Sequence, residues 1–526
     1  MDTYLPSKTI INPKTFPKKS LNIAVVGSGI AGLSAAWLLS KEHNTTLYEK
    51  EPELGGHANT IKINYPTENN RTIPINVDTG FIVYNNKNYP NLTNFFKYHD
   101  VNCADSNMSL SVSLDNGSYE YSGAGLGGIF GQRKNLFKKS QWQLIYDIFK
   151  FKKIASKYIA KNNNKESVLE DWLIKNKFST SFINNYIIPI TSAVWSCSTK
   201  DSLSFPTQTF LYFFYHHGLL NIKNRPKWKT VKNGSREYIN KVIKNSDFTY
   251  KNNVNIQSIE SSEKSVYIEI DDLKIKYDHV IMACHADQSL KLIKNVHKNV
   301  YKILNNFKFS QNKIILHSSS KYMPKNKSLW SSWNYFSKTS NNKYNNLPVQ
   351  MTYWMNLLQN INGKFPLFIT LNSKNNSIEK KYIFKEIFYT HPILDRNVLL
   401  GQSQLETIQG KENLWYAGAW TGLACMGLIW LISNFELEAL NYLEHYGLIR
   451  ETGSPIDYRH SWDNSTLFTS WFFIEIGRQA DHHDRGETHF WELDEVGAPN
   501  CGNGYFTLFA LALVPPLFHK YMRSEE

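Results

Sequence analysis

The sequence predicts an α/β fold, and three features near its start are the reason. Residues 21–26 form a largely apolar run that ends at Gly27, residues 30–39 carry apolar positions at helical spacing, and residues 45–48 form a second strand-like run before Glu49. A short apolar run bounded by glycine is typical of a buried strand. The order strand, helix, strand therefore predicts a βαβ unit with parallel strands.

The length and composition describe a large folded protein. With 526 residues the chain should hold about three structural units at ~100–200 residues each. Hydrophobic residues make up 42% and charged residues 20% of the chain, which excludes a disordered polymer. The formal net charge is +14, but the Lys residues are scattered among Asn and Ile with no basic stripe, so we expect no nucleic-acid partner.

Cysteine usage and the chain start indicate the compartment. The five cysteines lie far apart, without the spacing of a zinc or redox motif, which favours a reduced, intracellular protein. Residues 1–20 contain Lys and Pro but no apolar run, so they do not resemble a secretory signal. We therefore expect a cytoplasmic protein.

The remaining pattern predicts a discontinuous first domain and a helical cap. Strand-like segments recur after long helical stretches, so the first sheet can be assembled from segments distant in the sequence. The strand-like segments are 60–85, 248–270 and 277–283, the segments expected to form cap helices are 141–161 and 167–190, and 337–346 is an Asn-rich surface loop. We predict a Rossmann-like domain with discontinuous segments, an α+β substrate and cap domain, and a mainly helical carboxyl-terminal fragment.

Gly27-Ser28-Gly29-Ile30-Ala31-Gly32 fits the G-x-G-x-x-G pattern between a strand and a helix. Gly27 permits the tight turn, Gly29 lets a pyrophosphate approach the backbone, and Gly32 allows close packing of helix and strand. Glu49, at the end of the second strand, can accept hydrogen bonds from a ribose and would repel an NADP 2′-phosphate. This combination predicts a dinucleotide site; the alternative is that the glycines serve only a tight turn.

A second glycine pair favours FAD over NAD. Gly55-Gly56-His57-Ala58-Asn59-Thr60 follows Glu49 and resembles the extended fingerprint of flavin-dependent amine oxidases and phytoene desaturases. Residues 21–422 as a whole resemble the flavin-containing amine oxidoreductase superfamily, in particular a bacterial branch of NAD/FAD-binding oxidoreductases. The matching stretches are Val77–Tyr84, Ala193–Ser196, His217–Leu220, Arg225–Trp228, Asn233–Ser235 and Tyr277–Val280.

That resemblance implies positions for the cofactor. Asp78-Thr79-Gly80 would lie beside the isoalloxazine, Val254 in the strand that receives the adenine end, and Leu414–Thr421 would be the final flavin strand. The full expected cofactor-binding set is Gly27, Ser28, Gly29, Ile30, Ala31, Gly32, Glu49, Lys50, Gly55, Gly56, His57, Thr60, Asp78, Thr79, Gly80, Val254, Ala283, Gly418 and Ala419.

The resemblance also implies an FAD-dependent oxidoreductase that removes a hydride from its substrate, which requires an apolar pocket and little acid–base help. An acyl chain desaturated to an alkene is one expected substrate and an amine is the other; the electron acceptor is not predicted. We assign no catalytic residue, and we interpret the histidines nearest the motifs as structural: His57, His216, His217 and His285.

The carboxyl-terminal segment differs. The family's flavin strand is normally followed by a Gly- and His-containing turn and a helix, and these are absent. Residues 423–526 instead resemble the end of membrane-bound alkane monooxygenases of the fatty-acid-desaturase type, through Asn441–Leu448, Arg459–Trp462, Asp481–His483 and Gly504–Pro516. By that resemblance His445, His482 and His483 would be iron ligands, because imidazole suits iron.

This second resemblance is incomplete. Gln479 stands where the family has His, and the family's earlier His clusters are missing, so we expect no iron. The apolar run 423–435 has 13 residues, short of the ~20 that span a bilayer. Together with 508–517 it is the segment through which the chain would associate with a membrane.

Three hypotheses follow for the whole chain. The first is an FAD-dependent oxidoreductase in residues 1–422, with cofactor segments 21–85, 230–290 and 405–422, cap segments 86–229 and 291–404, and a truncated tail, 423–526. The second is a self-sufficient diiron membrane hydroxylase fused to a flavoprotein. The third is a non-catalytic fusion product in which loss of the last flavin-contacting helix impairs FAD binding.

Overall fold

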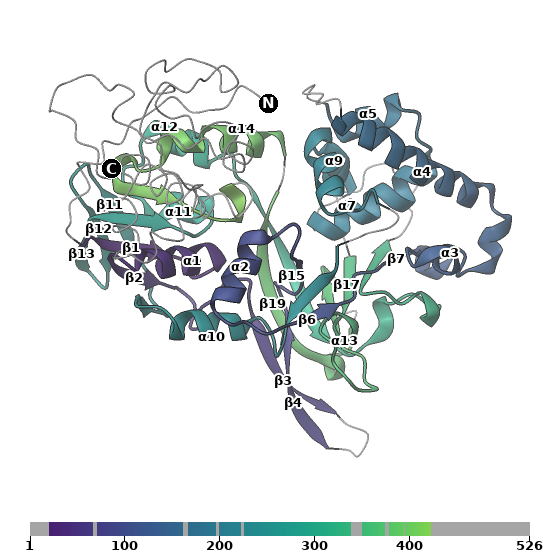
Figure 1. Cartoon of the computed structure of the whole chain (residues 1–526), viewed down its shortest axis with the longest axis horizontal. Coiled ribbons are helices and arrows are strands. Elements are labelled where there is room, and N and C mark those ends of the chain that lie inside the picture. The colour runs from purple at the N-terminus through teal and green to yellow at the C-terminus, as the bar shows by residue number, and fades with distance from the viewer. Residues whose placement is uncertain are drawn as a thin grey trace, which may run out of the picture. The chain divides into compact units, whose positions relative to one another are not determined.

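The described residues form a five-stranded and a seven-stranded sheet, three smaller sheets and a group of helices (Figure 1). The computed structural model describes residues 20–66, 71–160, 167–195, 199–221, 226–337, 350–373, 378–393 and 395–421. All of these belong to the first of the two units into which the chain divides, Met1–Met426. The expected loop 338–346, the apolar run 423–435 and the rest of the tail lie outside the described residues.

The first sheet has five parallel strands in the order β10-β2-β1-β14-β20. Because the strands are parallel, their carboxyl ends share one edge, and the segments that follow them meet there. In spatial order the strands are β10 (Thr249–Lys251), β2 (Asn44–Tyr48), β1 (Asn22–Val26), β14 (His279–Met282) and β20 (Leu414–Tyr416). The strands come from three distant parts of the sequence, which confirms the discontinuous Rossmann-like domain.

The central strand β1 is buried on both faces of the sheet, which explains why it is a continuous apolar run, whereas the edge strand β10 is exposed. Ala24 and Val26 contribute to one hydrophobic cluster, and Val25 to another on the opposite face with Leu33 and Leu47. Successive side chains of a strand point to opposite faces. The helices of this domain are α1 (Ile30–Leu39), α10 (Arg236–Lys244), α11 (Ala286–Leu292), α12 (Lys298–Leu304) and α14 (Arg396–Gln404).

The strand-like character expected over 248–270 is found as three strands. The structure divides it into β10, β11 (Ser258–Ser261) and β12 (Val266–Ile270), and β13 (Leu273–Tyr277) completes an antiparallel meander with the last two. Asn253 has φ 55°, in the left-handed region that ends an extended strand.

The second sheet has seven strands in the order β19-β15-β18-β17-β16-β7-β8 and is antiparallel except between β16 and β7. Its strands are β19 (Ile383–Pro392), β15 (Phe309–His317), β18 (Phe368–Leu371), β17 (Gln350–Trp354), β16 (Trp333–Ser337), β7 (Leu110–Leu114) and β8 (Tyr119–Ser122). Short elements connect the two sheets: β3 (Thr60–Pro66), β4 (Thr72–Asp78), β5 (Tyr84–Asn85), β6 (Cys103–Ser106), β9 (Trp228–Val231), α2 (Pro90–Tyr98), α3 (Gly125–Ile129) and α13 (Met355–Leu358).

The helical region holds much of the aromatic content as core. Phe151 contacts the rings of Trp172, Phe182, Phe210 and Phe214 and is buried. These rings come from α4 (Lys139–Ala160), α5 (Leu169–Lys175), α6 (Thr180–Phe182) and α9 (Thr207–His216); α7 (Ile188–Trp195) and α8 (Thr199–Ser204) complete the group.

The helical character expected over 167–190 is found, but not as one continuous helix. It is broken after α5, where Lys177 has φ 54° and Ser179 starts a new helix by accepting a hydrogen bond from the Phe182 amide. Ser at a helix start competes with continuation of the preceding helix. The expected helix 141–161 is confirmed as α4 up to Ala160. Within the described ranges no helix combines the length and apolarity required to cross a bilayer.

Candidate functional site

The glycine turn between β1 and α1 forms an open cradle at the carboxyl edge of the first sheet. Gly27 has φ 104°, and a Cβ there would lie 2.9 Å from the Ala283 carbonyl oxygen. A Cβ on Gly32 would lie 1.8 Å from the Gly27 oxygen. A Cβ on Gly29, in contrast, would meet no described atom within 4 Å. Gly27 and Gly32 are thus required by packing, whereas Gly29 borders open space.

The amino end of α1 is suited to an anion. The helix has no side-chain cap and no acidic residue in its first turn, which consists of Ile30, Ala31 and Gly32. The first amides of a helix have no intrahelical acceptor and carry the positive end of the helix dipole. A phosphate placed in the space beside Gly29 would meet these amides.

Glu49 faces the same turn. Its Oε2 accepts hydrogen bonds from the Ser28 amide at 2.9 Å and the Ser28 hydroxyl at 2.5 Å, and its Oε1 accepts one from the Glu51 amide at 3.0 Å. The Ser28 hydroxyl oxygen also accepts a hydrogen bond from the Gly55 amide at 2.9 Å. Ser28 therefore joins the acid, the turn and the second glycine pair.

The second glycine pair lies against the first motif. Gly56 has φ 56°, and a Cβ there would be 3.2 Å from the Cα of Gly29. Gly80 is packed on the same loop: its Cβ would lie 2.2 Å from the carbonyl oxygen of His57, which also accepts a hydrogen bond from the Phe81 amide. Segments 27–32, 55–57 and 79–81 therefore converge.

The Asp78 carboxylate is held by the protein itself. Its Oδ1 accepts from the hydroxyl of Thr60 at 2.6 Å and from the amide and hydroxyl of Ser235 at 2.7 and 2.8 Å. Its Oδ2 accepts from the Gln359 side-chain amide at 2.9 Å. Burial raises the pKa of Asp78 to about 6, although these hydrogen bonds act in the opposite direction. Asp78 thus connects β4 with the start of α10 through hydrogen bonds. Of the expected residues 78–80, Thr79 and Gly80 are the ones closer to the cradle.

The end of the first sheet closes the cradle from the other side. Ala417 donates its amide to the Met282 carbonyl, and Gly418 follows with φ 158°. Ala419 begins a single turn that contains Trp420, whose indole N–H donates to the Cys284 carbonyl at 3.0 Å. Gly418 and Ala419 therefore lie beside the segment that starts at Ala283, which itself packs on Gly27.

One expected cofactor residue differs from the prediction in its local structure. Val254 is not in a strand, because β10 ends at Lys251; its amide donates to the Glu49 carbonyl at 3.0 Å, so it still lies next to the acid. Lys50, directly after Glu49, is exposed, and its role in cofactor binding stays a prediction.

A group of histidines lies beside the second glycine pair. His57 Nε2 is 3.2 Å from the Thr390 carbonyl oxygen, and His285 Nδ1 is 3.1 Å from the Thr390 hydroxyl. Burial lowers the pKa of His57 and lowers that of His285 to about 4, so both imidazoles are neutral near pH 7. The Tyr389 hydroxyl contacts the Thr79 hydroxyl at 2.8 Å.

Tyr389 and Thr390 were not foreseen from the sequence, since they come from β19, about three hundred positions from their partners. His217, in contrast, serves the helical region: its Nδ1 is 2.9 Å from the Phe213 carbonyl oxygen and its ring stacks on Phe213. His216 lies at the end of α9. The interpretation of these histidines as structural stays a prediction.

Across the described residues no group of His, Cys, Asp and Glu side chains is arranged to hold a metal ion. The expected iron ligands His445, His482 and His483 lie outside the described residues.

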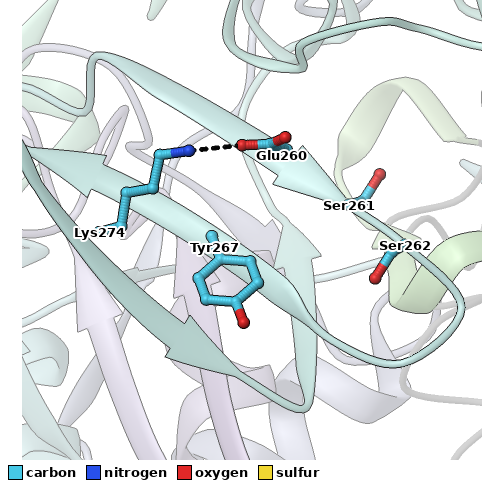
Figure 2. A pocket seen from close by; sticks show the side chains of 5 residues that line it. All are labelled: Glu260, Ser261, Ser262, Tyr267 and Lys274. Carbon is cyan, nitrogen blue, oxygen red and sulfur yellow. Dashed lines mark hydrogen bonds and ion pairs between the residues drawn. The ribbon is translucent and has the colours of Figure 1, made fainter.

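A separate depression of about 260 Å³ lies on the β11–β13 meander (Figure 2). It is lined by Glu260, Ser261, Ser262, Tyr267 and Lys274, and the Lys274 ammonium forms an ion pair with Glu260 at 2.8 Å. Exposed ion pairs of this kind contribute little. None of the expected site residues lines it, so we assign the candidate site to the glycine cradle.

Comparison with known proteins agrees with this geometry. Residues 25–99, which contain the cradle and Glu49, match the NAD(P)-binding Rossmann-like domain. A fatty acid isomerase from P. acnes that produces CLA covers 80% of this chain over its full length with a TM-score of 0.56. A putative protoporphyrinogen oxidase from Exiguobacterium has a TM-score of 0.55, and putrescine oxidase one of 0.52, with the same coverage of this chain.

The described chain has the flavin amine oxidase fold. The sequence identities to these three structures are 14%, 13% and 11%, so the likeness concerns the fold. The Rossmann-like match of residues 25–99 and this shared fold agree with the fold class that the sequence predicted.

The carboxyl-terminal region matches a different family. Residues 413–510 match the fatty acid desaturase family. An alkane 1-monooxygenase from Alcanivorax borkumensis is 29% identical over 140 residues, and one from Acinetobacter baylyi is 37% identical over 97 residues. These alignments cover 22% and 17% of this chain and 37% and 23% of the relatives' lengths. The chain therefore spans well under half of these curated relatives.

Proposed function

We propose that this protein binds FAD in the glycine cradle and removes a hydride from an apolar or amine substrate. The observation that carries the proposal is the open space at Gly29, bordered by the uncapped end of α1 and by Glu49. The amides of Gly29 to Gly32 would hold the pyrophosphate, and Glu49 would accept the hydroxyls of the adenosine ribose. Gly56 and Gly80 would let the chain pass close to the flavin.

The residues at the cradle fit this group chemically. Glu49 has two acceptor oxygens at the turn and no described cation opposes it with a salt bridge, so it suits a ribose and disfavours a 2′-phosphate. A bound flavin would supply the hydride acceptor. The neutral His57 and His285 keep charge away from the neighbouring segment, and the Tyr389 hydroxyl fixes Thr79 in position.

For the substrate we propose an acyl chain first and an amine second. The fatty acid isomerase shares the fold, and the tail matches the fatty acid desaturase family, so two independent likenesses involve lipids. Putrescine oxidase, solved with putrescine bound, supports the amine. We propose no nucleic-acid partner, an electron acceptor of unassigned chemistry, and a boundary between the flavin region and the tail at residue 422.

The substrate proposal is tested on the full-length protein loaded with FAD. Oxidised protein is mixed anaerobically with a long-chain fatty acid, its coenzyme A thioester or a primary diamine, and the flavin absorbance is followed. We expect bleaching with an acyl substrate and formation of an alkene in equal amount. Bleaching by the diamine alone would select the amine, and an unchanged spectrum with every candidate would contradict hydride removal from these classes.

The sequence of the tail supports a second candidate function for the chain. Its match to the fatty acid desaturase family and the alkane monooxygenases favours a diiron membrane hydroxylase that receives electrons from the fused flavoprotein. Gln479, where that family has His, and the missing earlier clusters oppose it. Iron analysis of membrane-expressed protein decides: two irons per chain that are lost in His482→Ala would establish the hydroxylase, and iron-free protein would exclude it.

The third hypothesis is a fusion product that holds FAD weakly, and it is tested on the same purified protein. It predicts flavin that is lost during purification and recovered only at high FAD concentration. A peptide that supplies the missing helix should then raise the FAD affinity.

A further inference from the structure

Helix α4 exposes an aromatic stripe on the face turned away from the core. Trp142, Tyr146 and Phe149 are 53%, 62% and 56% exposed, although aromatic rings are usually buried. They are spaced four and three positions apart, so they share one face of the helix. The opposite face carries the buried Leu144 and Phe151. The stripe is therefore not needed for packing of the helix.

The preceding turn extends this apolar surface. Phe137 is 91% exposed and Leu136 is 40% exposed. The indole N–H of Trp142 donates to the Leu136 carbonyl at 2.8 Å, which fixes the turn against the start of the stripe. The ring of Trp142 also contacts Phe130, which directly follows α3. Leu126, in the first turn of α3, is 73% exposed. Contiguous exposed apolar residues, unlike scattered ones, mark an interaction surface.

The charge of this surface is mainly positive. Residues 126–160 contain eight Lys and Arg residues and one acid. That acid, Asp147, is buried and accepts a hydrogen bond from the Ser179 amide, so it does not reach the surface. The helices α6 and α9, which pack on α4, contain no acidic residue, whereas α5, which contacts α4 through Trp172, carries Glu170 and Asp171. Exposed cations border the stripe at Arg133, Lys134, Lys139, Lys153 and Lys157.

We propose that this surface, α4 with the turn before it, docks on an anionic lipid bilayer. Aromatic rings insert at the boundary of headgroups and acyl chains, and Lys and Arg attract anionic headgroups. A second copy of the chain would bring two cationic faces together, which like-charge repulsion opposes. Single-stranded nucleic acid stacks on aromatic faces, but the exposed aliphatic side chains of Leu126 and Leu136 offer it nothing. Figure 1 shows α4 among the helices α5, α7 and α9. In the sequence, α4 is far from the tail, 423–526.

The test compares full-length proteins, so that any contribution of the tail is the same in each. Wild type is sedimented with vesicles of phosphatidylcholine alone or of phosphatidylcholine and phosphatidylglycerol in equal parts. Trp142→Ser/Tyr146→Ser/Phe149→Ser removes the stripe. The control, Tyr250→Ser/Tyr301→Ser, removes two rings of similar exposure, 46% and 55%, elsewhere on the protein.

We expect the wild type and the control to bind the anionic vesicles alike. The partition coefficient of the triple variant should be at least about tenfold lower. If the triple variant does not fold, Lys153→Glu/Lys157→Glu decides, since it changes only exposed positions and should reduce binding at least about fivefold.

Equal binding of the folded triple variant and the wild type would overturn the proposal, as would equal binding to neutral and anionic vesicles. Stronger binding of the wild type to polyuridylic acid than to the anionic vesicles would assign the surface to nucleic acid instead. A change from dimer to monomer in the triple variant, with vesicle binding unaltered, would assign it to a second copy of the chain.

Discussion

Substitution of single glycines in the cradle separates cofactor binding from folding. Gly29 has φ −59° and ψ 175°, which any residue adopts, and a Cβ there meets no described atom within 4 Å. Gly29→Ala should therefore leave the free energy of unfolding within about 1 kcal/mol of the wild type. The added methyl group would, however, occupy the space in which we place the pyrophosphate.

The size of the loss follows from the hydrogen bonds at stake. Displacing the phosphate from one charge-assisted amide contact costs about 1.5–3 kcal/mol, which corresponds to a roughly 10- to 100-fold weaker FAD affinity. Gly32→Ala is the matched control, because its Cβ would lie 1.8 Å from the Gly27 oxygen and the backbone must shift. That variant should lose roughly 3 kcal/mol of stability.

Two measurements on each protein complete the comparison: urea unfolding followed by circular dichroism, and titration with FAD followed by quenching of flavin fluorescence. Gly29→Ala should be stable and bind poorly, and Gly32→Ala should be unstable. If Gly29→Ala bound FAD like the wild type, the cradle would not be the phosphate site. If it unfolded as easily as Gly32→Ala, the space beside Gly29 would not be open.

Three further substitutions test the groups around the cradle. Glu49→Gln should lower FAD affinity about tenfold in the same titration, because a charge-assisted ribose contact is lost; unchanged affinity would place the ribose elsewhere. The pKa of Asp78 is about 6 in the folded protein against an ordinary value of 3.8. The stability that the protonated Asp78 contributes is therefore complete below pH 4 and is lost as the pH rises through 6. The loss in the free energy of unfolding is about 3 kcal/mol. Asp78→Asn should therefore flatten the stability profile between pH 4 and 7 in urea unfolding, and an unaltered slope would refute the burial argument. The pKa of His285 is lowered to about 4, so the opposite sign holds: its stability contribution is present above pH 6.5 and is lost as the pH falls towards 4. His285→Gln should reduce that acid-side loss, whereas the same acid sensitivity in the variant would show that His285 is not buried as a neutral ring.

The sequence predicted those parts of the fold in which local pattern and tertiary structure agree. Gly27, Gly32 and Glu49 lie within one βαβ unit, so the spacing along the chain already determines how they meet. The parallel sheet could also be predicted, since strands buried on both faces are continuous apolar runs.

Other parts depend on contacts that spacing does not reveal. Tyr389 and Thr390 reach the cradle from β19, and no periodicity in that strand indicates its partners. The break at Lys177 depends on a positive φ in an otherwise helical composition. Asp78 was expected beside the flavin, and its carboxylate proves to be engaged by Ser235 and Gln359, which lie far along the chain.

The flavin content of the full-length protein tests the central claim most directly. Protein purified in the presence of FAD and then freed of unbound cofactor is denatured, and the released FAD and the protein are quantified. We expect one FAD per chain in the wild type and a clearly lower ratio in Gly29→Ala. Folded wild-type protein that is colourless and takes up no added FAD would contradict the account.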